Sequence, residues 1–129
     1  MGKHDFNVRH DTLRRAQDEL LARRNEEYGP GNGIYTRWRD PVVTPEHVPL
    51  DWRYDLDPAT NPYLMERIGI NTTFNAGAIS WRARYALVVR VEGVDRKSWF
   101  AVAESNNGVD GFRFRPRPIT MPELNAPDT

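Results

Sequence analysis

Two arginines at the end of an apolar segment have the residue types and spacing to bind an anion. Arg90 directly follows the apolar run 85–89, which predicts a buried strand, and Arg96 lies in the turn that comes next. Burying a guanidinium group costs on the order of several kcal/mol unless it is paired and hydrogen-bonded. We therefore expect Arg90 to be buried and to have a partner.

The partner of Arg90 has two interpretations, and the sequence leaves both open. Glu92 lies two residues further along the chain, so it would point to the same face of a strand and form a structural ion pair. Alternatively, Arg90 and Arg96 stand near one end of a hairpin, where two planar guanidinium groups suit the oxygens of a phosphate, a carboxylate or a polyol.

A third candidate is Asn75, which is flanked by small residues in the segment Phe-Asn-Ala-Gly-Ala-Ile at 74–79. Small residues allow a ligand to approach the backbone closely. The amide of Asn75 is able both to donate to and to accept from a sugar hydroxyl. This segment, together with the two arginines, predicts a binding site for a sugar or an oxyanion.

The elements that must position these residues are β-strands. Alternation and turn residues predict strands over 72–79, 84–91, 98–103 and 111–114, joined by short turns, which is a four-stranded antiparallel meander. One such meander leaves two faces and two edges open. A single blade of a β-propeller has this form, and the sequence contains no second copy of it.

The part of the chain before the strands predicts a helix and then a proline-rich segment. Leucine and alanine at helical spacing predict a narrow amphipathic helix over roughly 11–27, ended by Gly29-Pro30-Gly31, which packs on a neighbouring surface or on a partner subunit. Residues 32–62 are dense in proline and aromatic residues and predict an ordered loop region, with strand character only at 34–39. We interpret Trp38, Trp52 and Tyr54 as packing residues.

Composition excludes several classes of protein. The 129 residues carry 18 basic and 18 acidic side chains, so the chain lacks the excess positive charge with which proteins bind nucleic acid or anionic membranes. It has no cysteine and no long apolar run, which favours a cytoplasmic protein. His4, His10 and His47 do not have the spacing of metal ligands, so we expect no metal.

Several segments together resemble the inverting β-mannoside phosphorylases of glycoside hydrolase family 130. The segments are 31–37, 52–67, 74–79, 90–98, 100–105 and 121–129, and the resemblance covers nearly all of the chain from the helix onward. It implies a five-bladed β-propeller, of which residues 1–31 are a helical extension implicated in oligomerisation and residues 32–129 are the first blade. It also implies that inorganic phosphate, with no cofactor, cleaves a β-mannoside disaccharide to α-mannose 1-phosphate and, in the branch that this chain resembles, glucose.

The resemblance also implies roles for individual residues. Asn75 and Arg90 would contact the mannosyl unit, and Arg96 would bind phosphate or orient the reacting centre. Asp95 and Ser98 are weaker candidates, and we interpret them as supports of the turn and the strand.

The resemblance implies a general acid outside this sequence. In the family, Pro-Asp-Thr runs into Asn-Val-Tyr-Asp, whose aspartate is that acid, and the sequence ends at Thr129. We therefore expect the 129 residues alone to be inactive. The alternatives are a phosphorylase of other β-mannosides, such as mannooligosaccharides or mannosyl-N-acetylglucosamine, and a non-catalytic carbohydrate-binding or assembly fragment.

Overall fold

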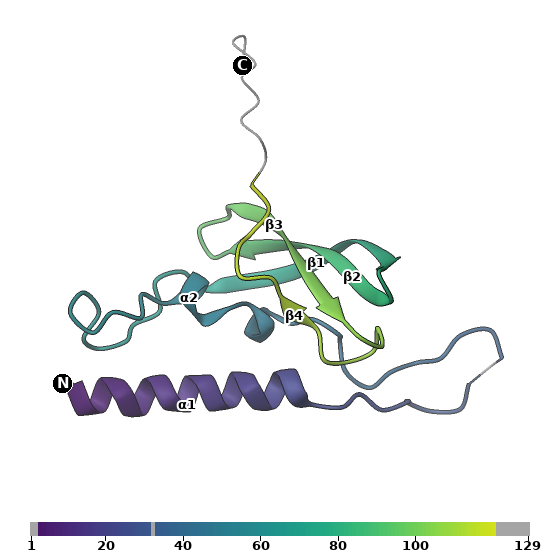
Figure 1. The fold of residues 1–129 in the computed structure, drawn as a ribbon, viewed down its shortest axis with the longest axis horizontal. Helices are drawn as coiled ribbons and strands as arrows, with labels where there is room; N and C mark the ends of the chain where they lie inside the picture. Colours follow the sequence, from purple (N-terminus) through teal and green to yellow (C-terminus); the bar gives the residue numbers. More distant parts are fainter. Residues whose placement is uncertain (1–2, 32, 121–129) are drawn as a thin grey trace, which may run out of the picture.

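The computed structural model describes residues 3–31 and 33–120, without the side chains of residues 3, 75, 76 and 81. The segment 121–129 that contributes to the resemblance lies outside the described residues. A long helix comes first, two short helical turns follow, and four strands complete the described chain (Figure 1). The elements are α1 (Lys3–Ala22), η1 (Pro45–His47), α2 (Leu50–Arg53), β1 (Ile70–Trp81), β2 (Arg84–Gly93), β3 (Ser98–Ser105) and β4 (Arg113–Phe114).

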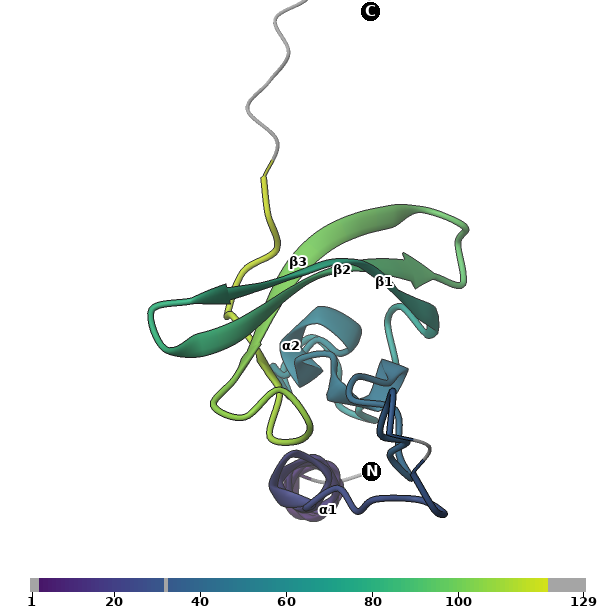
Figure 2. The same cartoon turned by 90° about the vertical axis from the view of Figure 1, so that its right-hand side faces the viewer.

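The four strands form one antiparallel sheet in the order β1-β2-β3-β4, so the predicted meander is confirmed. The first three strands extend beyond the predicted ends, because pairing continues into the turns, whereas β4 keeps only two paired residues. A bulge shifts the β1–β2 register between Asn75 and Gly77. The sheet is strongly curled and is compatible with one propeller blade (Figure 2).

The hydrophobic core lies on one face of this sheet, which we call the inner face. Alternate residues of β2 and β3 meet the proline-rich segment there, and the buried cluster consists of Val48, Leu87, Val89, Val91, Ala101, Ala103 and Phe112. Trp52 adds edge-on ring contacts to Trp99 and Phe114, so the prediction that it is a packing residue is confirmed. The proline-rich segment is therefore the layer that fills the curl of the sheet (Figure 2).

Helix α1 packs against this layer from the other side, and its bounds differ from the prediction. It begins at Lys3 and ends at Ala22, well before Gly29-Pro30-Gly31. The amide of Asn25 donates to the carbonyl oxygens of Asp40 and Val109, at 2.9 and 2.8 Å. These long-range bonds hold the chain in an extended path, and a local pattern of leucines does not reveal them.

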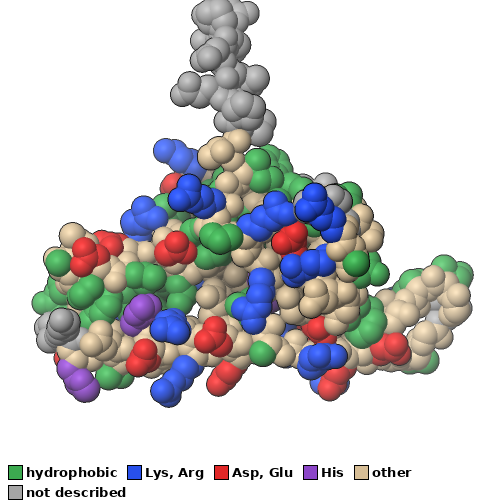
Figure 3. Space-filling model, in the orientation of Figure 1, with side chains coloured by type: hydrophobic (Ala, Val, Ile, Leu, Met, Phe, Trp, Pro, Cys, Tyr) green, Lys and Arg blue, Asp and Glu red, His purple; other side chains and the backbone are tan. Residues whose placement is uncertain are grey.

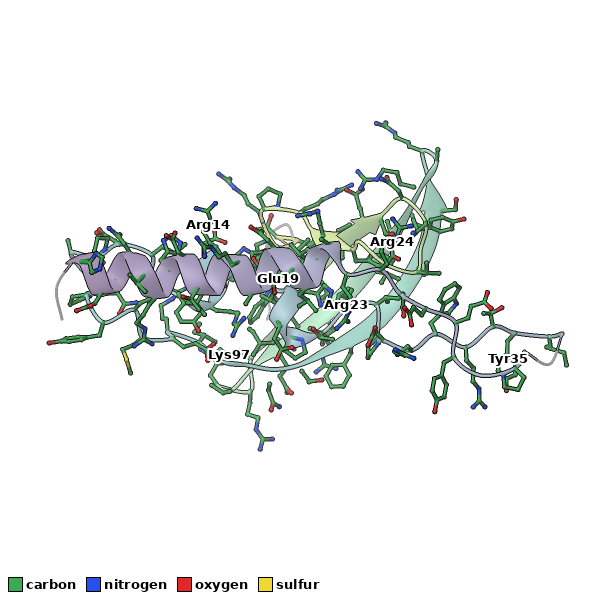
Figure 4. The ribbon with its side chains drawn as sticks, turned by 90° about the horizontal axis from the view of Figure 1, so that it is seen from below. Arg14, Glu19, Arg23, Arg24, Tyr35 and Lys97 are labelled. Atoms are coloured by element: carbon green, nitrogen blue, oxygen red, sulfur yellow. The ribbon has the colours of Figure 1, made fainter. Side chains whose placement is uncertain are left out.

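The inward side of α1 is its apolar side. Phe6 and Leu21 are buried against the body of the chain, and Gln17 donates to the carbonyl oxygen of Val48 at 2.8 Å. Arg14 and Glu19 lie on the outer side of the helix (Figure 4). The two ends of the apolar side are thus covered within the chain, whereas Leu13 and Leu20 between them are half-buried and Ala16 is exposed. A partner subunit bound through this helix stays a prediction.

The strand character predicted for residues 34–39 is wrong except at one position. Trp38 forms an isolated bridge with Glu27, and the segment between them extends as a loop beside the sheet (Figure 1). The glycines at 29 and 33 have left-handed φ angles of 73° and 81°, and Ile34 is 88% exposed. Within the described residues, the bridge between Glu27 and Trp38 does not continue into a pair of strands. Over the described residues, no helix combines the length and the hydropathy that a membrane span needs.

Candidate functional site

Arg90 lies on the outer face of the sheet, opposite the core. Strand β2 buries Leu87, Val89 and Val91 on the inner face, and Arg90 stands between the last two with its side chain exposed. The prediction that Arg90 is buried is therefore wrong. An apolar run predicted a strand buried on both sides, whereas the sheet of this chain is covered on only one.

Three residues form a cross-strand row at this position. The register pairs Arg90 with Phe74 of β1 on one side and with Phe100 of β3 on the other. Both phenylalanine side chains are exposed, at 46% and 41%. The row places one cation between two aromatic residues on an open surface, where a ligand has access.

Two contacts orient the Arg90 side chain. Its guanidinium carbon lies 5.6 Å from the ring centroid of Phe74, within the range of a cation–π interaction. Its Nε donates a hydrogen bond to Ser98 Oγ at 3.3 Å. Phe74 thus covers one side of the guanidinium group, and Ser98 engages the nitrogen nearest the side-chain stem.

The predicted structural ion pair with Glu92 does not form. Glu92 instead accepts a hydrogen bond from the side-chain amide of Asn71 at 3.1 Å. Within residues 3–31 and 33–120, no carboxylate pairs with Arg90. The charge of Arg90 is left for an anion or a polyol, which was the second interpretation of the sequence.

Arg96 and Asp95 lie in the turn between β2 and β3. Arg96 has a left-handed φ of 68°, and its backbone N–H donates to the Gly93 carbonyl at 3.0 Å. Asp95 Oδ1 accepts from the backbone N–H of Lys97 at 3.0 Å, as expected of a turn support. The turn begins three residues beyond Arg90, which is about 10 Å along a strand. The structure thus places both arginines on one hairpin.

Asn75 lies at the bulge of β1, where its backbone pairs with Val89, the neighbour of Arg90. Its side chain is outside the described residues. A bulge locally redirects a strand, and bulges are common beside binding sites. The position suits the predicted contact with a sugar, which stays a prediction.

A cavity that the sequence did not suggest lies beneath α1. It has a volume of about 430 Å³ and is lined by Leu13, Ala16, Gln17, Leu20, Arg23, Thr44, Glu46, Leu50 and Arg53. It lies on the opposite side of the chain from the outer face of the sheet, between the helix and the proline-rich layer. The cavity therefore has no part in the site around Arg90.

The carboxyl groups with a lowered pKa form hydrogen bonds that stabilise the fold. The side chain of Arg115 bonds to Glu104 at 2.9 Å and lowers its pKa, and the backbone N–H of Asn25 lowers the pKa of Asp110 in the loop before β4. The hydroxyl group of Thr60 donates a hydrogen bond to Asp55 and lowers the pKa of that carboxyl group. Three or more possible metal ligands do not gather anywhere in the described part of the chain. None of these three carboxyl groups contacts Arg90 in the described chain.

Basic side chains are spread over the upper part of the molecule in Figure 3, with acidic side chains between them. This mixed surface agrees with the neutral net charge of the chain. The surface seen in Figure 3 therefore has no large area of a single charge.

Comparison with known proteins gives one informative match. No protein-family model matches the chain. Over 124 residues, which are 96% of the chain, it is 56% identical to the 4-O-β-D-mannosyl-D-glucose phosphorylase of Bacteroides fragilis. The predicted resemblance to a β-mannoside phosphorylase is confirmed. The chain spans only 32% of the length of that relative.

The contribution of Phe74 was missed by the sequence analysis. Phe74 belongs to a segment that the resemblance used, but its side chain was given no role. Alternation counted from the turn between β1 and β2 would place Phe74 opposite Val91, and the bulge between Asn75 and Gly77 shifts it opposite Arg90. The pairing of Phe74 with Arg90 therefore depends on a bulge that alternation does not reveal.

Proposed function

We propose that this chain is part of a phosphorylase that cleaves 4-O-β-D-mannosyl-D-glucose with inorganic phosphate, giving α-D-mannose 1-phosphate and D-glucose with inversion. The observation that carries the proposal is the 56% identity to a phosphorylase of this name over nearly the whole chain. The curled four-stranded sheet supports the view that the whole protein is a five-bladed β-propeller of which this sheet is one blade.

In the proposed reaction, a phosphate oxygen forms a bond to C1 of the mannosyl unit while the bond from C1 to the glucose oxygen breaks. The proton that this oxygen needs comes from a carboxylic acid, acting through a sugar hydroxyl. Because phosphate is the nucleophile, no second carboxylate is needed to activate water. Arg90 and Asn75 would hold the mannosyl unit, and Arg96 would contribute positive charge for the phosphate.

By itself, the 129-residue chain should form no mannose 1-phosphate. The two glutamates on the outer face of the sheet near Arg90 are already engaged, Glu92 with Asn71 and Glu104 with Arg115. The bond from Arg115 lowers the pKa of Glu104, which disfavours the protonated form that a general acid needs. The proposed acid belongs to the segment that follows Pro-Asp-Thr in the family.

A chimera tests the proposal. The matched segment of the Bacteroides fragilis phosphorylase is replaced by this chain, and mannose 1-phosphate formation from mannosylglucose and phosphate is measured, with the isolated chain as the control. We expect activity in the chimera and none in the isolated chain. A chimera that is folded but inactive, while the unmodified relative is active, would contradict the proposal.

A second candidate is a non-catalytic carbohydrate-binding fragment, favoured by the exposed row Phe74, Arg90 and Phe100. Binding of mannosides by the isolated chain, together with an inactive chimera, would support this candidate. Assay of the chimera with mannooligosaccharides and with mannosyl-N-acetylglucosamine distinguishes the other β-mannoside substrates.

A further inference from the structure

We infer that Phe74 and Ser98 are positioning residues, which hold the Arg90 guanidinium group in one orientation so that its two terminal nitrogens face a ligand on the outer face of the sheet. The ligand class is a polyol, namely the hydroxyl groups of the mannosyl unit, and to that extent the inference rests on the proposed function.

Arg90 has less conformational freedom than an exposed arginine usually has. A long exposed side chain samples many rotamers, and fixing it on a ligand costs conformational entropy. A side chain that is already held in place avoids much of this cost on binding. Arg90 is exposed, yet two neighbours on two different strands contact it, which distinguishes it from a freely moving surface arginine.

The same contacts determine which atoms of Arg90 remain available. The guanidinium carbon lies 5.6 Å from the Phe74 ring centroid, and Ser98 Oγ accepts from Nε at 3.3 Å. These contacts leave the two terminal Nη groups without a carboxylate partner in the described chain. Two parallel N–H donors in a planar fork match a pair of oxygens, so the free end of Arg90 suits neighbouring hydroxyls of a sugar.

The sheet also provides an internal control. Phe74 and Phe100 both pair with Arg90 in the register, and both are exposed to a similar degree, at 46% and 41%. Within the described residues only Phe74 has a ring contact with the guanidinium group. Phe100→Leu is therefore a matched control for Phe74→Leu, since each removes one exposed ring from the same row.

The experiment follows the Nε–Hε signal of Arg90 by NMR in the ¹⁵N-labelled 129-residue chain, assigned with Arg90→Lys. We expect a signal that the Phe74 ring current shifts upfield and that exchanges slowly with water. Phe74→Leu removes the shift, Phe74→Tyr keeps it, and Phe100→Leu leaves it unchanged. Ser98→Ala speeds the exchange, and Ser98→Thr restores it. Equal effects of the two leucine variants, or no effect of Phe74→Leu, would overturn the inference.

Titration with mannosylglucose then separates this inference from the proposed function. We expect the Arg90 signal to move in the wild-type chain and the Kd to rise about two- to fivefold in Phe74→Leu, the size expected for losing an exposed cation–π contact. Binding that is equally tight in Phe74→Leu overturns the positioning role alone. A wild-type signal that mannosylglucose does not move overturns the role of Arg90 toward the sugar, and inorganic phosphate as a second probe shows whether Arg90 binds an oxyanion instead.

Discussion

At the scale of single residues, His47 couples the stability of this chain to pH. Its ring is buried, and Nδ1 is hydrogen-bonded to the backbone N–H of Thr44 at 2.9 Å. Burial, followed by the charge of Arg23, lowers the pKa of His47 below 6.5. The imidazole therefore binds a proton more readily in the unfolded chain than in the folded one. Its contribution to the free energy of unfolding is present above pH 6.5 and is lost as the pH falls.

We therefore predict that the free energy of unfolding decreases between about pH 6.5 and pH 5, where the shifted carboxyl groups remain ionised. Urea unfolding at several pH values measures this decrease. In His47→Gln the slope in this window should flatten, whereas His4→Gln, at an exposed position of α1, should keep it. A slope that is the same in wild type and His47→Gln would show that another group titrates.

At the scale of elements, the connection after α1 depends on one asparagine. Asn25 Oδ1 accepts from the backbone N–H of Asp40 at 3.0 Å, and its amide donates to the carbonyls of Asp40 and Val109. Asn25→Ala should lower the free energy of unfolding by about 1–3 kcal/mol, because it leaves several backbone groups without partners. Thermal or urea unfolding measures the change, and Asn106→Ala, at an exposed position in the loop before β4, is the control. Equal stability of the two variants would contradict this role.

The same element shows where sequence-based prediction works and where it fails. The strands were predicted because alternation and turn residues are local signals, and their order followed from short turns. The end of α1 was not predicted, because Asn25 bonds to a residue 84 positions further along the chain. The sequence placed Arg90 on a strand correctly. It did not predict that Arg90 is exposed, because the face of the sheet that is covered depends on how residues 42–54 fold back on β2.

At the scale of the whole molecule, the outer face of the sheet is the face that residues 3–31 and 33–120 leave uncovered. The proline-rich layer and α1 both lie on the inner side, so the curl of the sheet presents its other face outward (Figure 2). Three exposed apolar side chains lie on this face, those of Phe74, Ile79 and Phe100. Ile79 belongs to it because it pairs with Ala86, which is on the same face of β2 as Arg90. Exposed apolar sheet surface of this kind favours association.

We therefore predict that the isolated chain self-associates through the outer face. Sedimentation velocity over a range of concentrations should show association that Ile79→Lys weakens, because the substitution places a charge on the exposed apolar face. Ile34→Lys is the matched control, since Ile34 is even more exposed, at 88% against 61%, but lies on the loop beside the sheet. In the chimera, where the proposed neighbouring blade would cover the end of this face at Ile79 and leave the row at Arg90 open to the ligand, Ile79→Lys should reduce the yield of folded protein. A wild-type chain that stays monomeric at every concentration would show that the outer face does not need a cover.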